Sequence, residues 1–492
     1  MRKLIGTLFL TLWMVGCSDF GDLNNDPNNP AEPRTDLLMT DAQRTIGSYV
    51  GAVTGTLYSQ YFSEVYYTDS SVYTTINFDF SGWYANTNNN GQTGPLTNLQ
   101  TIIELNNNED TANNSNVIAG GGTQNQLAVA RILKAYFFHT ITDRWGRVPY
   151  SEALKGQGNV TPKYDSMKSI YQGLLKELSE AVAQMNGEPG PTGDFIFGGD
   201  MGRWEAFANT LRMRIALRMA DKNGQDAQQA FEDAYNDGII QESVMFPYGS
   251  NNDNENPWYD RYETRIDYAI SKTIADTMKN YEDMRLTVYA ADSANSGPLQ
   301  GDGSHGLDDI EGFPYGLSQS SAAEIGNTSR SLPGNQILQQ DAELPILTMA
   351  EVHFALAEAK ERGWNVPGTA QGHYEAGIEA SWKQWGVYEN QDFNNYLSKS
   401  DIAYDPGQWK QRIGFQKWIA LFPLGYEAWA EWRRLDYPAL DPAPDAVNDS
   451  GEIPVRQAYP TSESELNTEN YKAAVKAQGS DGLDTKLWWD VN

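Results

Sequence analysis

The sequence contains seven stretches in which apolar residues recur every three or four positions. In residues 167–185, for example, Ile170, Leu174, Leu178 and Val182 are each four positions apart. This spacing places the apolar side chains on one face of an α-helix, where they can pack against a neighbour. The seven stretches are residues 124–141, 167–185, 203–219, 348–361, 373–386, 409–421 and 426–435. They predict a mostly α-helical fold.

Loops rich in glycine and proline separate these stretches, for example residues 185–194 and 362–368. Helices joined in this way form antiparallel pairs, and such pairs stack into a solenoid in tetratricopeptide repeats. The sequence shows no clean period of about 34 residues, which those repeats would have. We therefore predict paired helices in a single domain over residues 35–492, and the division into repeats stays open.

The N-terminus has the pattern of an export signal. Arg2 and Lys3 precede an uncharged, largely apolar run of 12 residues, 4–15. That run is shorter than the roughly 20 residues that a membrane-spanning helix needs. A positive start, a short apolar run and a small residue before a break are typical of a secretory signal peptide. We predict a signal peptide over residues 1–16.

Cys17 is the only cysteine in the sequence, and it directly follows this segment. A small residue followed by cysteine is the place where bacterial lipoproteins receive fatty-acyl chains, and two or more chains give stable anchoring. With Cys17 acylated, no thiol remains for a disulfide or for thiol catalysis. Residues 17–34 are rich in Asn, Asp and Pro and are predicted to be a flexible tether. The alternative is an ordered arm that docks through Phe20 and Leu23.

The formal net charge of −29 argues against several partners. Nucleic acid requires a basic face, and adhesion to anionic lipid requires basic clusters. No later stretch approaches the roughly 18 consecutive apolar residues of a membrane-spanning helix. We expect contact with the membrane only through the lipid anchor, and the acidic surface suits a protein exposed outside the cell.

Three long polar inserts interrupt the helical pattern, at residues 61–98, 246–267 and 292–333. Loops of this length are uncommon unless they have a function, and binding residues gather on loops that a rigid scaffold holds. Aromatic residues make up 12% of the sequence. Exposed rings can stack on sugars or pack against protein partners. We therefore expect the ligand site on these inserts.

Within the inserts, candidate ligand-binding residues are aromatic side chains beside Asn, Asp or Arg, together with one asparagine. For Trp83, an interface with a partner or packing within the loop is the alternative. Trp258 follows Pro257 and could instead anchor its loop. The predicted ligand-binding residues are Tyr66, Tyr67, Trp83, Tyr84, Trp258, Tyr259, Tyr315 and Asn327.

The sequence contains no complete catalytic or metal-binding motif. The sequence has four histidines and no H-E-x-x-H or Cys/His cluster, so no zinc site is predicted. Asn251, Asp253 and Glu255 alternate as at the start of a calcium loop, but the glycine and the final glutamate of an EF-hand are missing. Arg144 and Trp145 follow a helical stretch and are interpreted as its end and part of the scaffold. We predict no catalytic residues, no metal and no cofactor.

Several motifs, in order along the chain, resemble one family. They are ITDRWGRVPYSEAL (141–154), WEAFANTLRMRIALR (204–218), ILTMAEVHFALAEAKERGW (346–364), YEAGIEASWKQWGV (374–387), QKWIALFPLGYEAWAEWRRLDYPAL (416–440), IPVRQAYPTSESELN (453–467) and LWWD (487–490). Together with Cys17, they resemble the SusD/RagB-like nutrient-binding outer-membrane lipoproteins, in the branch described as starch-binding and outer-membrane-associating. One departure is Met284, where the family often has proline.

This resemblance implies about four tetratricopeptide-like helix pairs, with the inserts carrying the ligand. It also implies a SusC-like, TonB-dependent outer-membrane transporter as the partner, over which the lipoprotein acts as a hinged lid. The implied ligand is an oligosaccharide or another nutrient, and related proteins take up peptides.

Two other functions stay open from the sequence. A glycoside hydrolase needs two carboxylates facing each other across its substrate, and with 65 acidic residues such a pair can always be found. A protein-binding solenoid scaffold would use the helix pairs alone. We expect a binding protein rather than an enzyme.

Overall fold

The computed structural model describes residues 33–74, 78–85, 94–295, 305–325 and 330–491. The predicted signal peptide, Cys17, almost all of the predicted tether and Asn327 lie outside these residues. None of the helices in the described ranges is both long enough and apolar enough to cross a membrane.

The seven predicted helices are all present, with ends within a few residues of the expected ones. In α7 the buried positions include Ile170, Leu174 and Leu178, and the Ser166 side chain caps the first turn by accepting a hydrogen bond from the Ser169 amide. The helices that match the predictions are α6 (Thr123–Trp145), α7 (Met167–Gln184), α8 (Met201–Met219), α15 (Met349–Glu361), α16 (Ala370–Gln384), α18 (Trp409–Ala420) and α19 (Gly425–Leu435). The predicted mostly helical fold is confirmed.

Further helices precede, separate and follow these seven. They are α1 (Thr35–Val50), α2 (Val53–Tyr58), α3 (Ser81–Tyr84), α4 (Pro95–Asn107), α5 (Ser115–Ile118), α9 (Gly224–Asn236), α10 (Pro257–Thr264), α11 (Lys272–Asn280), α12 (Leu286–Tyr289), α13 (Gln319–Ile325), α14 (Asn335–Leu338), α17 (Asn390–Leu397), α20 (Thr461–Leu466) and α21 (Thr468–Gln478). Short 3-10 turns occur at Gly156–Gly158, Ser293–Asn295, Leu307–Asp309 and Pro406–Gln408.

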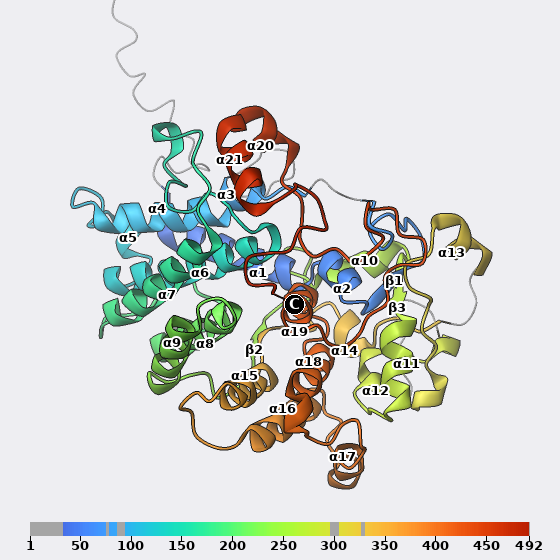
Figure 1. Cartoon of the computed structure of the whole chain (residues 1–492). Coiled ribbons are helices and arrows are strands. Elements are labelled where there is room, and N and C mark those ends of the chain that lie inside the picture. Colours follow the sequence, from blue (N-terminus) through green and yellow to red (C-terminus); the bar gives the residue numbers. More distant parts are fainter. Residues whose placement is uncertain (1–32, 75–77, 86–93, 296–304, 326–329, 492) are drawn as a thin grey trace, which may run out of the picture.

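The long helices pack in consecutive pairs. Helix α6 packs against α4 and α7, α8 against α7 and α9, α15 against α16 and α18, and α18 against α19. In Figure 1 the helices α4 to α9 lie on one side of the molecule, α10 to α14 lie on the other, and α19 lies near the centre. The paired scaffold therefore holds α10 and α13, which belong to the second and third inserts, on its flank.

Two small antiparallel sheets join segments that are far apart in the sequence. Strand β1 (Phe62–Glu64) pairs with β3 (Tyr268–Ile270), so that Ser63 faces Ala269. Strand β2 (Val244–Phe246) pairs with β4 (Leu344–Leu347), with an irregular register after Val244. The first pairing joins the first insert to the segment that follows the second, and the second pairing joins the start of the second insert to the segment before α15.

A set of charged side chains is buried where α6, α8, α15, α18 and α19 meet. Arg218 is fully buried and donates to Asp143, Glu427 and Glu431. Arg434 forms a two-pronged pair with Glu358, with N···O distances of 2.5 and 2.6 Å. This buried ion network consists of Asp143, Arg214, Arg218, Glu351, Glu358, Lys417, Glu427, Glu431 and Arg434.

Electrostatic interactions within this network favour the charged form of the Glu431 carboxylate. Burial alone would raise the pKa of Glu431, but Arg434, Lys417 and Arg218 beside it hold that pKa well below the usual value. Every carboxylate in the network thus has a cation in contact. The network fixes the relative positions of five helices.

Candidate ligand-binding cleft

An open cleft of about 580 Å³ lies between α1, α3, the end of α6, the start of α19 and residues 252–260. Its size is within the range of small-molecule binding sites. We call it the α1 cleft. Its lining residues include Asp41, Arg44, Thr45, Ser48, Tyr49, Trp83, Arg144, Tyr248, Asp253, Glu255, Asp260 and Tyr426.

Helix α1 supplies one complete wall of the cleft. Residues three, four, seven and eight positions after Asp41 share a face of an α-helix with it, and all of them line the cleft. The opposite face carries Met39, Ile46 and Val50 in the core. The wall is therefore a rigid helix and not a loop. Its cleft-lining side chains are Asp41, Arg44, Thr45, Ser48 and Tyr49.

Three aromatic rings form a second wall. The rings of Tyr49 and Tyr426 are stacked, with centroids 5.6 Å apart and planes 4° apart. Trp83 meets Tyr49 edge to face at 5.8 Å and packs against Phe137 of α6 at 5.6 Å. Trp83 is half-buried, so part of its ring is open to the cleft. Trp83 and Tyr49 are both half-buried, and the exposed part of such a ring can stack on a sugar ring, whereas the buried Tyr426 supports Tyr49 from behind.

Arg144 lies in the last turn of α6, next to this wall, and is 9% exposed. Its Nε donates to Oε1 of Gln457 at 2.7 Å, and its Nη2 donates to the Tyr426 hydroxyl at 3.0 Å. The guanidinium carbon is 4.1 Å from the centre of the Tyr426 ring and 4.2 Å from that of Trp145. Burial lowers the pKa of Arg144. No ion pair joins Arg144 to a carboxylate of the residues that the structure describes.

The rim of the cleft is acidic. Residues 252–260 contribute Asp253, Glu255 and Asp260, and Arg44 of α1 donates to the backbone carbonyl of Asp253. Asp41 is held by Asn98, whose Nδ2 donates to its carboxylate at 2.7 Å. Burial raises the pKa of Asp41, although Asn98 and Arg44 oppose this. The rim can accept hydrogen bonds from hydroxyl or amino groups.

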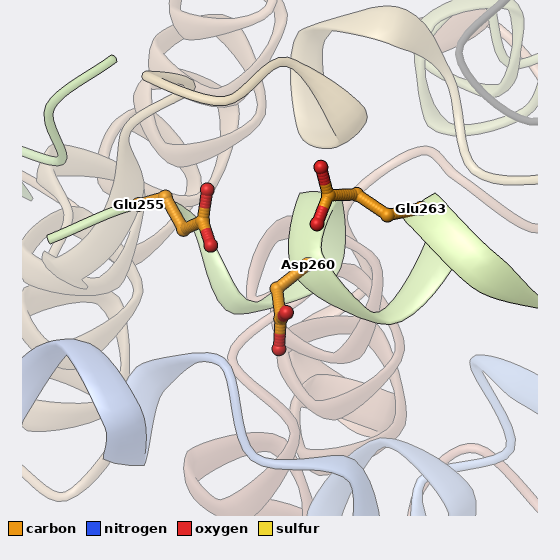
Figure 2. Close-up of side chains that lie close together, drawn as sticks. All are labelled: Glu255, Asp260 and Glu263. Carbon is orange, nitrogen blue, oxygen red and sulfur yellow. The ribbon is translucent and has the colours of Figure 1, made fainter. Parts of the chain in front are cut away.

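Three carboxylates gather where the rim meets α10. Figure 2 shows Glu255 on the segment before the helix, and Asp260 and Glu263 on the helix itself. Their oxygens lie within 4.8 Å of one another. Asp260 and Glu263 are exposed, and Glu255 accepts a hydrogen bond from Gln340 at 2.8 Å. Exposed carboxylates at this spacing add negative charge to the rim, and we assign no metal to them.

The structure places the predicted ligand residues in different surroundings. Trp83 lines the α1 cleft, and its contact with a ligand stays a prediction. Tyr84, the next residue, lines a separate hollow of about 530 Å³, and its hydroxyl donates to the Pro149 carbonyl at 2.7 Å. Tyr66 and Tyr67 are 41% and 64% exposed but do not line the cleft. Tyr259 is half-buried beside the acidic rim, where burial and then Glu263 and Glu255 raise its pKa.

Two of the predicted ligand residues are buried. Trp258 lies in the first turn of α10 and has no exposed surface, because it packs against Phe62 with ring centroids 4.6 Å apart. Tyr315 is 7% exposed and packs in an aromatic cluster with Tyr73. Neither ring lines the α1 cleft. The prediction for Trp258 is corrected, because a ring with no exposed surface cannot reach a ligand, and ligand contact by Tyr315 stays a prediction.

Three residues that line the cleft were not predicted from the sequence to bind ligand, namely Tyr49, Arg144 and Tyr426. Tyr49 lies on α1, whose apolar stripe of Met39, Ala42, Ile46 and Val50 would have predicted a helix there. Arg144 was interpreted as the end of a helix, and the structure confirms that position but also brings its side chain to the cleft.

Comparison with known proteins decides the family. A SusD-like family model, described as "Starch-binding associating with outer membrane", matches residues 27–460. The chain belongs to this SusD-like family. The members of the SusD-like family are binding proteins without catalytic activity, which confirms the prediction of a non-enzyme.

Solved structures of SusD-like proteins share the fold. A chitin-binding protein is 27% identical, with a TM-score of 0.76 over 93% of this chain and 100% of that one. A SusD homologue from Bacteroides uniformis is 24% identical, with a TM-score of 0.74 over 93% and 99%. A chitin-binding SusD homologue from Flavobacterium johnsoniae is 24% identical, with a TM-score of 0.72 over 93% and 99%. No curated protein sequence matches significantly.

Proposed function

We propose that this SusD-like protein binds an oligosaccharide in the α1 cleft at the cell surface and delivers it to a SusC-like, TonB-dependent transporter. The observation that carries the proposal is the aromatic wall of Trp83, Tyr49 and Tyr426 beside polar groups of α1. Rings supply stacking surfaces for sugars, and the polar groups pair with hydroxyls. The names of two similar structures include chitin binding, which supports a glycan ligand.

Replacing Trp83 with alanine is expected to weaken oligosaccharide binding by about 30-fold, which corresponds to about 2 kcal/mol, the usual threshold for a dominant aromatic contact. The measurement is isothermal titration calorimetry of the full chain in detergent against a panel of oligosaccharides and peptides. Trp409→Ala is the matched control, because Trp409 is also half-buried but does not line the cleft. Equal losses in both variants, or binding of peptides alone, would overturn the proposal.

We also propose that residues 1–16 are a signal peptide, that Cys17 is acylated, and that residues 17–34 are the tether of a domain formed by residues 35–492. Replacing Cys17 with alanine is expected to abolish labelling by a radioactive fatty acid and to release the protein from the outer-membrane fraction. A single covalent site explains both losses. A variant that stays labelled and membrane-bound would contradict the proposed anchor.

A further inference from the structure

Arg144 differs from most other buried arginines of the molecule in having no counter-ion. Among the described residues, Arg214, Arg218, Arg285 and Arg434 are each in contact with a carboxylate. Arg412 and Arg433 have none either, but they donate to backbone carbonyls instead. Arg144 donates only to two neutral side chains and lines the α1 cleft.

The guanidinium of Arg144 keeps unused donors. An arginine carries five N–H groups. The Nε donor and one Nη2 donor are used, and both N–H groups of Nη1 and one of Nη2 have no acceptor among the described residues. These free donors reach solvent through the open cleft, and the rings of Tyr426 and Trp145 lie against the guanidinium. An acceptor from the ligand would complete the site.

Two of the four carboxylates that line the cleft are held by amide side chains. Asp41 accepts from Asn98, Glu255 accepts from Gln340, and neither forms an ion pair with Arg144. The cleft therefore has a cation beside its aromatic wall and negative charge at its rim. A polyanion would be repelled at the rim, whereas a single carboxylate surrounded by hydroxyls would satisfy both regions.

We infer that the ligand of the α1 cleft is an oligosaccharide with one uronic acid among neutral sugars, whose carboxylate pairs with Arg144. The inference rests on the proposed glycan-binding function and names its ligand class. The planar guanidinium matches a carboxylate in two-pronged geometry, and hydrogen bonds to a charged acceptor are the stronger ones. The neutral sugars on either side would stack on the aromatic wall and donate hydroxyls to the rim.

The test compares matched ligands in the unsubstituted full chain. A panel of oligosaccharides with one uronic acid is titrated beside the carboxyl-reduced form of each, in which the acid is a neutral sugar. At least one acidic member is expected to bind about tenfold more tightly than its reduced form, as a charge-assisted contact implies. Neutral glycans that bind as tightly as acidic ones would overturn the inference and leave the proposed function intact. If no glycan binds, or if only peptides bind, both the inference and the proposed function are overturned.

Variants then assign the preference to one residue. Arg144→Gln is expected to remove the preference for the acidic form and to keep binding of the reduced form, and Arg144→Lys is expected to keep part of the preference. Arg44→Gln removes the other guanidinium of the cleft and is expected to keep more of the preference than Arg144→Gln. Loss of the preference in Arg44→Gln but not in Arg144→Gln would overturn the assignment. If Arg144→Gln does not fold, the comparison of Arg144→Lys with Arg44→Gln decides it.

Discussion

Replacing Arg218 with leucine is expected to lower the free energy of unfolding by about 4 kcal/mol, within the usual range for breaking a buried ion pair. Arg218 is fully buried and contacts three carboxylates, Asp143, Glu427 and Glu431. Leucine would fill much of the space but would leave these three charges without their shared cation. The measurement is urea denaturation at neutral pH, followed by tryptophan fluorescence.

The control for this prediction is an ion pair at the surface. Lys472 and Glu469 lie 3.3 Å apart with side chains 66% and 88% exposed. Lys472→Ala is expected to change stability by less than about 1 kcal/mol, because solvent screens the pair. If Arg218→Leu unfolded at the same urea concentration as Lys472→Ala, the buried ion network would not be the link between the helices that we describe.

Replacing Gly425 with alanine is expected to lower the free energy of unfolding by about 3 kcal/mol, because the added methyl group overpacks the space between two backbones. The same substitution is expected to weaken ligand binding about tenfold or more. A Cβ atom at Gly425 would lie 2.1 Å from the Thr56 amide nitrogen and 2.3 Å from the Gly55 carbonyl carbon. Both atoms are backbone, so α2 and α19 would have to move apart. Tyr426 follows directly and would leave its stacked position on Tyr49. Urea denaturation and calorimetric titration measure the two effects.

Gly224→Ala is the matched control. It lies at the start of α9, and a Cβ atom there would meet nothing within 4 Å. We expect its stability to change by no more than about 0.5 kcal/mol, as for surface sites without special features, and its ligand affinity to stay the same. Similar losses in both glycine variants would show that the contact between α2 and α19 does not hold the cleft in shape.

The scaffold could be predicted from the sequence because each helix carries its own periodic signal. The four-residue spacing in α7 and the capping Ser166 specify that helix locally, without reference to the rest of the chain. The charged residues of the scaffold were harder to interpret. No local pattern shows that Glu358 is buried, because its partner Arg434 lies 76 positions away in the sequence.

The cleft could be predicted only in part. Trp83 was predicted because it is an aromatic residue close to asparagines in a polar insert, and the structure places it at the cleft. Trp258 has the same local signal but packs inward, since its direction depends on Phe62, nearly 200 positions earlier in the sequence. The surroundings of Arg144 likewise come from Gln457 and Tyr426, 313 and 282 positions away. Long-range contacts of this kind have no local pattern.

The buried ion network has a consequence for how such a protein can change over generations. Arg218, Glu431 and Arg434 each satisfy at least two partners, so a mutation in one of them must be matched by others at the same time. The cleft, in contrast, also has exposed lining residues such as Ser48 and Asp253, which can be exchanged singly because they belong to no buried network. Proteins that descend from this chain can therefore change their ligand specificity more easily than their helical fold.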